Sequence, residues 1–250
     1  MQSPIEIEQL ALNAWPGLNT YLHAGLVVRW ADGYTKRANS ATALFDASWT
    51  ADKQQWVEAF YAQRNQRPIF RLLSFTQPEI LDQKLKAAGY EQLDLTAVMA
   101  IDLHTLHSEN EIDGRCQIIP LDEWLEIFHE LDRSKLGEEK TRLHHALLQQ
   151  IPGKVCPMVL YSGEGLNREP AACGLGVLDG GAIGLFDIIT AENHRRRGFG
   201  KLLMASLLVC GIQSGANVGY LQVVEKNYPA IALYQKLGFA QLYRYWYRAK

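Results

Sequence analysis

The chain has 250 residues, of which 48% are apolar and 21% charged, as is typical of a globular protein with one large core or two small ones. The formal net charge is −2, so no overall field favours nucleic acid or an anionic membrane, and neither is expected as a partner. The start lacks the features of a signal peptide, and the longest apolar stretch, 202–212, is too short to span a bilayer. The four cysteines show no zinc-finger spacing, so we expect no metal site, no disulfide framework and a reducing, cytoplasmic location.

The first half alternates predicted helices and strands. A strand-like run at 26–30 ends near Asp32-Gly33, a dipeptide typical of hairpins, so a return strand is expected at 34–41. Arg29, Arg37 and Asn39 flank this hairpin, where they either face a substrate cleft or, as we expect, form pairs at the surface. The other predicted elements are a helix at 5–15, a helix capped by Thr50 or Asp52, a strand at 69–75, a helix at 79–87, a strand at 93–103 and a polar linker at 107–111.

The second half predicts a meander of strands followed by alternating helices and strands. The expected elements are a strand at 116–119, helices at 120–131 and 138–150, strands at 158–161, 172–178 and 182–190, a helix at 199–213, a strand at 218–224, a helix at 229–237 and a strand at 241–247. His144 and His145 lie on one of these helices without partners at metal-ligand spacing, so a solvated or packing role is expected. This order indicates an α/β (α+β) fold.

The most informative segment joins the strand at 182–190 to the helix at 199–213. The loop between them contains Gly198 and Gly200, and it opens directly into an apolar helix. A helix N-terminus offers unpaired backbone N–H groups and a positive dipole end, and glycine lets a phosphate approach the main chain. The loop has neither the Walker pattern nor the dinucleotide fingerprint, so the sequence predicts a different phosphate ligand.

Arg195-x-x-Gly198-x-Gly200 after a strand resembles the pyrophosphate-binding motif of the GNAT acetyltransferases, and 221–239 resembles that family's second signature. The resemblance covers 115–250. It implies a mixed, mostly antiparallel central sheet flanked by helices, and acetyl-CoA as the acyl donor. The residues that it assigns to coenzyme A are Ile188, Ile189, Thr190, Arg195, Arg196, Arg197, Gly198, Phe199, Gly200, Lys201, Asn227 and Tyr234.

The first half carries a faint copy of the second signature. The segment 85–93 resembles 234–242, each at the end of a helix, with a glycine where a helix C-cap favours a left-handed residue. The first half has no R-x-x-G-x-G, and its counterpart of Tyr234 is Leu85. We therefore predict two tandem units, a degenerate GNAT-like domain at 1–110 and a catalytic GNAT domain at 115–250, with the first unit shaping or covering the amine pocket.

Attack of an amine on a thioester needs a base for the amine, stabilisation of the oxyanion and a proton for the departing thiolate. Asp187, on the strand that leads into the phosphate loop, is the first candidate base, and Glu225, at the end of the next strand, is the second. By resemblance, Tyr234 protonates the thiolate, Asn227 bonds the cofactor or strand backbone, and the main chain at 188–190 pairs with the pantetheine arm.

The expected function is transfer of acetyl from acetyl-CoA to a primary amine of a small molecule or peptide, by direct attack through a tetrahedral intermediate. Two alternatives stay open, a non-catalytic acyl-CoA sensor and an acyltransferase that uses another acyl-CoA. The expected state is a monomer or homodimer.

Overall fold

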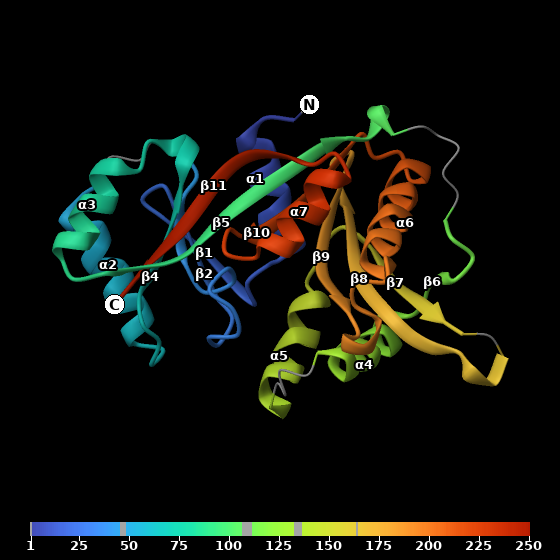
Figure 1. Cartoon of the computed structure of the whole chain (residues 1–250). Coiled ribbons are helices and arrows are strands. Elements are labelled where there is room, and N and C mark those ends of the chain that lie inside the picture. Colours follow the sequence, from blue (N-terminus) through green and yellow to red (C-terminus); the bar gives the residue numbers. More distant parts are fainter. Residues whose placement is uncertain (1, 46–48, 107–111, 133–136, 164) are drawn as a thin grey trace.

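The computed structural model describes the whole chain except residues 1, 46–48, 107–111, 133–136 and 164. Its strands form one 11-stranded sheet in the order β1-β2-β3-β4-β11-β5-β10-β9-β8-β7-β6 (Figure 1). The strands are β1 (Asn19–His23), β2 (Leu26–Trp30), β3 (Ala41–Ala43), β4 (Ile69–Leu73), β5 (Glu91–Asp102), β6 (Cys116–Ile118), β7 (Lys154–Ser162), β8 (Glu169–Asp179), β9 (Ala182–Thr190), β10 (Val218–Val224) and β11 (Ala240–Ala249). Among the described strands only the β3/β4 and β9/β10 pairs are parallel, so the sheet is mixed and mostly antiparallel, as predicted.

Helices cover both faces of this sheet. They are α1 (Pro4–Ala14), α2 (Ala51–Ala62), α3 (Glu79–Ala87), α4 (Leu121–Leu131), α5 (Glu138–Leu148), α6 (Phe199–Gln213) and α7 (Tyr228–Lys236). On the strands of the second half, α6 packs its leucines against one face, and α4 packs Trp124 and Phe128 against the other. No helix in the described part of the chain is long and apolar enough to cross a membrane. The four cysteines are buried and carry free thiols.

The two halves of the chain exchange strands in the middle of the sheet. The last strand, β11, lies between β4 and β5, and β5 in turn lies between β11 and β10 (Figure 1). Thus β4–α3–β5 and β10–α7–β11 are related by an approximate two-fold arrangement, and each receives the final strand of the other. Gly89 and Gly238 follow α3 and α7 with φ of 86° and 96°, the left-handed conformation that glycine adopts without a Cβ penalty. This topology supports a tandem origin, while the division near residue 110 stays a prediction.

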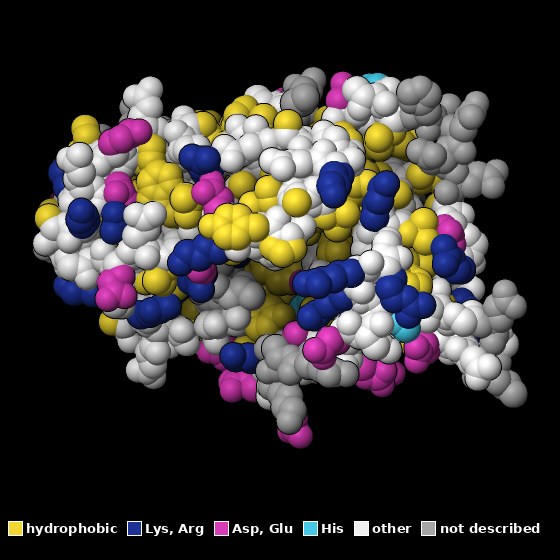
Figure 2. Space-filling model, viewed as in Figure 1, with side chains coloured by type: hydrophobic (Ala, Val, Ile, Leu, Met, Phe, Trp, Pro, Cys, Tyr) yellow, Lys and Arg dark blue, Asp and Glu magenta, His cyan; other side chains and the backbone are white. Residues whose placement is uncertain are grey.

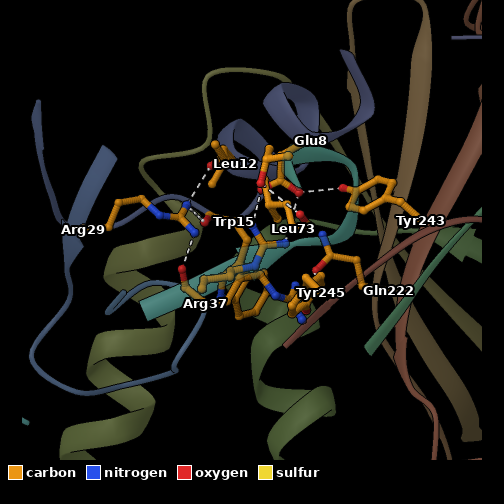
Figure 3. Close-up of polar contacts among 11 residues, drawn as sticks. Glu8, Leu12, Trp15, Arg29, Arg37, Leu73, Gln222, Tyr243 and Tyr245 are labelled. Carbon is orange, nitrogen blue, oxygen red and sulfur yellow. Dashed lines mark hydrogen bonds and ion pairs between the residues drawn. The ribbon is translucent and has the colours of Figure 1, made fainter. Parts of the chain in front are cut away.

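Buried polar contacts tie the exchanged strand to the first half. Glu8 of α1 and Arg71 of β4 form an ion pair inside the core, with side-chain exposures of 0% and 1%. Tyr243 of β11 donates to Glu8 at 2.5 Å (Figure 3). The Arg71 guanidinium lies 3.8 Å from the Tyr245 ring centroid. Because each charge is compensated and hydrogen-bonded, this cluster fixes α1, β4 and β11 in one geometry.

The predicted elements are confirmed to within a few residues, with one exception. Asp32 and Gly33 have the positive φ of a hairpin turn, 50° and 76°, but the return strand predicted at 34–41 is wrong. Asn39 accepts hydrogen bonds from the N–H groups of Ala31 and Gly33, and this holds the segment in successive turns. The antiparallel neighbours of β2 in the described part of the chain are β1, which precedes it, and the short β3, which follows these turns. The polar linker predicted at 107–111 lies outside the described residues.

Candidate active site

Strands β9 and β10 diverge at the centre of the second half. Their parallel pairing runs from Ala182 and Val218 only to Leu185 and Leu221, although β9 continues to Thr190 and β10 to Val224. Beyond the divergence, β9 stays paired with β8 and β10 with β5. The edge of β9 that faces β10 therefore presents main-chain groups to a gap, where an extended ligand with amide groups has room to pair.

A β-bulge lies on β9 at this divergence. Register changes between the pairs Cys173–Ile189 and Leu175–Phe186, so Asp187 and Ile188 together oppose the single residue Gly174. Asp187 has φ of 48°, a strained conformation for a residue with a side chain. A Cβ on Gly174 would lie 2.4 Å from Ile188 Cδ1, so a larger residue opposite the bulge would require the Ile188 side chain to shift. Such bulges redirect side chains and are common next to active sites.

A cavity of about 470 Å³ occupies the gap between the two strands. It brings together several residues predicted for the site, since Asp187, Ile188, Asn227 and Tyr234 all line it. Figure 2 shows a hollow with hydrophobic side chains inside it and Lys and Arg side chains around it. The remaining lining residues are Trp15, Tyr34, Thr35, Arg37, Phe128, Asp132, Lys140, Leu185, Phe186, Leu221, Gln222, Val223 and Val224.

The carboxylate of Asp187 is held by a histidine inside the core. His144 on α5 is fully buried, and its Nε2 donates to Asp187 Oδ2 at 3.0 Å. The His144 ring is packed among Trp15, Tyr34 and Phe128, with centroid separations of 5.8, 5.4 and 5.2 Å. The Asp187 side chain is 19% exposed, so it is oriented by this hydrogen bond and still reachable from the cavity. The expected packing role of His144 thus has a specific partner, which the sequence did not reveal.

Tyr234 and Asn227 belong to α7 and its cap. The Asn227 side chain accepts from the Ala230 N–H at 3.3 Å and so caps α7, an interaction with the protein's own backbone. Tyr234 packs against Phe239, and burial raises the pKa of its hydroxyl above 10. The phenol therefore stays protonated at neutral pH and remains a hydrogen-bond donor.

Glu225 lies apart from this group. Its carboxylate forms an ion pair with Arg244 of β11 at 2.6 Å, and it lines a separate hollow next to Tyr228. The structure thus brings Asp187, and not Glu225, into the cavity that Tyr234 lines.

The predicted phosphate loop begins α6 directly after β9. Gly198 is the N-cap residue with φ of 86°, and Arg195, Arg196 and Arg197 are exposed beside it. Arg195 Nε donates to the Thr190 carbonyl at 3.3 Å, which joins the loop to the end of β9. The first N–H groups of an α-helix have no partner within the helix, so this loop combines free donors, a dipole and three cations.

Buried contacts hold that loop in place. His194 is 4% exposed, and its Nε2 lies 2.7 Å from Ser162 Oγ and 3.0 Å from Glu169 Oε1. Its ring stacks on Phe199, with centroids 5.2 Å apart, so Phe199 faces the core. The side chain of Lys201 is exposed, and those of Ile189 and Thr190 are half-buried. The basic run before α6 is therefore supported by packing underneath it.

A family model described as "Probable histone acetyltransferase Rv0428c C-terminal" matches residues 5–248. The chain belongs to this acetyltransferase family. It is also 28% identical over 249 residues to the "Uncharacterized N-acetyltransferase YobR" of Bacillus subtilis (strain 168), with 98% of each sequence covered. This acetyltransferase is therefore an acyltransferase enzyme, as the loop and Tyr234 had suggested.

Solved structures share the fold of this acetyltransferase. A GCN5-related N-acetyltransferase from Kribbella flavida aligns with a TM-score of 0.74 at 14% identity, covering 100% of this chain and 96% of that one. A "Tandem GNAT protein from the clavulanic acid biosynthesis pathway" aligns with a TM-score of 0.58 at 14% identity, covering 79% and 69%. The GNAT-like fold predicted from the loop and the second signature is confirmed.

Proposed function

We propose that this acetyltransferase transfers the acetyl group of acetyl-CoA to a primary amine of a small molecule or peptide by direct attack. The observation that carries the proposal is the cavity between β9 and β10, which Asp187 and Tyr234 both line next to the N-terminus of α6. The unpaired backbone N–H groups at the start of α6, together with three exposed arginines, fit the pyrophosphate of coenzyme A. The open edge of β9 fits its pantetheine amides.

In this proposal each group has one task. Acetyl-CoA supplies a thioester carbonyl as the electrophile. Asp187, oriented by His144, accepts the proton of the attacking amine, directly or through a water molecule. Main-chain N–H groups beyond the Asp187 bulge polarise the carbonyl. The Tyr234 hydroxyl, whose pKa is raised by burial, donates its proton to the departing sulfur. Glu225 is not assigned the role of base, because its carboxylate is paired with Arg244.

Release of coenzyme A from acetyl-CoA, measured over a panel of amines with the full-length protein, tests the proposal. We expect amine-dependent thiol release. If acetyl-CoA binds and no amine releases thiol, the protein is an acyl-CoA sensor, and the proposal fails. Competition among acetyl-, succinyl- and longer acyl-CoAs identifies the donor, and preference for a donor other than acetyl-CoA would contradict that part of the proposal.

The choice of base is tested with a matched pair of substitutions. We expect Asp187→Asn to lower kcat by about 100-fold or more, the usual contribution of a general base, and Glu225→Gln to leave it close to that of the wild type. The reverse order would assign the base to Glu225. The expected setting is the cytoplasm, with the protein acting as a monomer or homodimer.

A further inference from the structure

A second cavity of about 450 Å³ adjoins the one between β9 and β10. The two share Tyr34, Thr35, Arg37, Gln222 and Val224, so they meet along these residues. The second cavity is built from both halves of the chain, with residues of the turns at 33–39, of β5 and of β11. The second cavity therefore adjoins the one that Asp187 and Tyr234 line.

The charged side chains of the second cavity are mostly cationic. They are Lys36, Arg37, Arg67 and Asp94. Lys36 and Asp94 form an ion pair at 2.7 Å and neutralise one another. In the described part of the chain no ion pair is found for Arg37 or Arg67. Arg67 is exposed, whereas Arg37 is half-buried and lines both cavities.

Arg37 is held by aromatic packing and by its backbone. Its Cζ lies 5.2 Å from the Trp15 ring centroid and 5.8 Å from that of Phe186, the residue before Asp187. The buried Arg29 donates to the main-chain oxygens of Arg37, Leu12 and Trp15 (Figure 3). Among the described residues, the Arg37 Nε is buried without a hydrogen-bond partner. A partly buried guanidinium with an unused donor can bind an anion, and its planar fork fits a carboxylate.

We infer that Arg37 binds the carboxylate of the acceptor, so that the acceptor class is small amines that also carry a carboxylate, such as amino acids. This inference rests on the proposed acetyl transfer. Arg37 lies where the two cavities meet and lines the first cavity together with Asp187, so an acceptor that spans the two residues presents its amine to Asp187 and its carboxylate to Arg37. Polyamines would place a second cation near Arg37, which disfavours them.

The test compares matched pairs of acceptors with the full-length protein, each an amino acid and its decarboxylated amine or carboxamide. We expect kcat/KM to be at least about 10-fold higher for the carboxylate member, as for a charge-assisted hydrogen bond. Arg37→Gln should raise KM for carboxylates by about 10- to 100-fold, with a smaller change in kcat. The KM for the decarboxylated amines should change little in Arg37→Gln. Arg37→Lys keeps the positive charge but not the planar guanidinium, so its KM for carboxylates should lie between those of the wild type and Arg37→Gln.

Arg64→Gln is the matched control, since Arg64 also packs on an aromatic ring, Phe60, at 3.8 Å, and it lines neither cavity. The inference would be overturned if the wild type preferred the decarboxylated amines. It would also be overturned if Arg37→Gln lowered kcat/KM equally for the carboxylate and the decarboxylated acceptor of a pair. If no amine releases thiol, the proposed transfer fails, and equilibrium binding of the same pairs to the wild type still decides the role of Arg37. Equal affinity for carboxylate and carboxamide would then refute it.

Discussion

The exchange of β5 and β11 predicts that the second half does not fold alone. A fragment of residues 112–250 keeps β11 but loses both of its neighbours, β4 and β5. Tyr243, Tyr245 and Tyr247 of β11 are 2–4% exposed in the whole chain, and all three would lose most of their burial. The fragment would also lose Glu8 and Arg71, which contact the first two of these rings.

The cost can be estimated from area. Each buried tyrosine removes about 200 Å² from water, and at about 25 cal/mol per Å² the three rings contribute about 15 kcal/mol, an upper estimate. Whole domains are stable by only about 5–15 kcal/mol. We therefore expect no cooperative unfolding transition for the fragment in near-UV circular dichroism with urea, and recovery of the transition when 1–111 is co-expressed with it. A fragment that unfolds cooperatively alone and binds acetyl-CoA as the whole chain does would refute this reasoning.

Three further outcomes are expected. Gly198→Glu should abolish acetyl-CoA binding in calorimetry, because it adds a negative charge and a side chain at φ of 86°. The control is Gly215→Glu at the far end of α6, which has a similar φ of 84° and should bind acetyl-CoA normally. An equal loss of binding in both variants would contradict the assignment of the loop. Tyr234→Phe should lower kcat by about 100-fold and barely change acetyl-CoA affinity, and an unchanged kcat would exclude the hydroxyl from the reaction. Burial raises the pKa of Tyr220 and Tyr247 above 10, so the unfolded chain loses these protons at a lower pH than the folded chain does. The urea midpoint of unfolding should therefore stay constant below about pH 10 and fall above it. A midpoint that does not change with pH in this range would argue against buried phenols.

Local signals in the sequence predicted most of the fold. The glycines at 89 and 238 take the left-handed conformations expected of them, and Thr50 caps α2 by accepting from Lys53. The failed hairpin shows the limit of such signals. Asp32 and Gly33 do turn the chain, but the Asn39 side chain then occupies the N–H groups that a return strand would need. Whether these N–H groups bond to a side chain or to a neighbouring strand depends on the tertiary structure, and the Asp32-Gly33 dipeptide alone does not determine it.

The candidate site was only partly predictable for the same reason. Asp187 and Tyr234 followed from their positions beside two motifs, and both line one cavity. His144 was missed because its partner, Asp187, is 43 residues away and no spacing rule connects them. Arg29 and Asn39 were expected at the surface but are 2% and 3% exposed, and both bond the backbone around the turns at 31–39. That rigid backbone is what places Arg37 over Trp15.

The strand exchange also decides how the role of the first half can be examined. If the two units packed as separate domains, deleting the first would reveal what it adds to the active site. In this protein, deleting the first half removes β4 and β5 from the sheet. A loss of activity would then follow from loss of the fold and would not show that a substrate contact had been removed. Arg37 offers a way around this difficulty, because its side chain lines both cavities, while its main-chain oxygen, which any substitution keeps, still accepts from Arg29. A change confined to the carboxylate-bearing acceptors in Arg37→Gln would therefore measure what the first half contributes to recognition, separately from its contribution to the sheet.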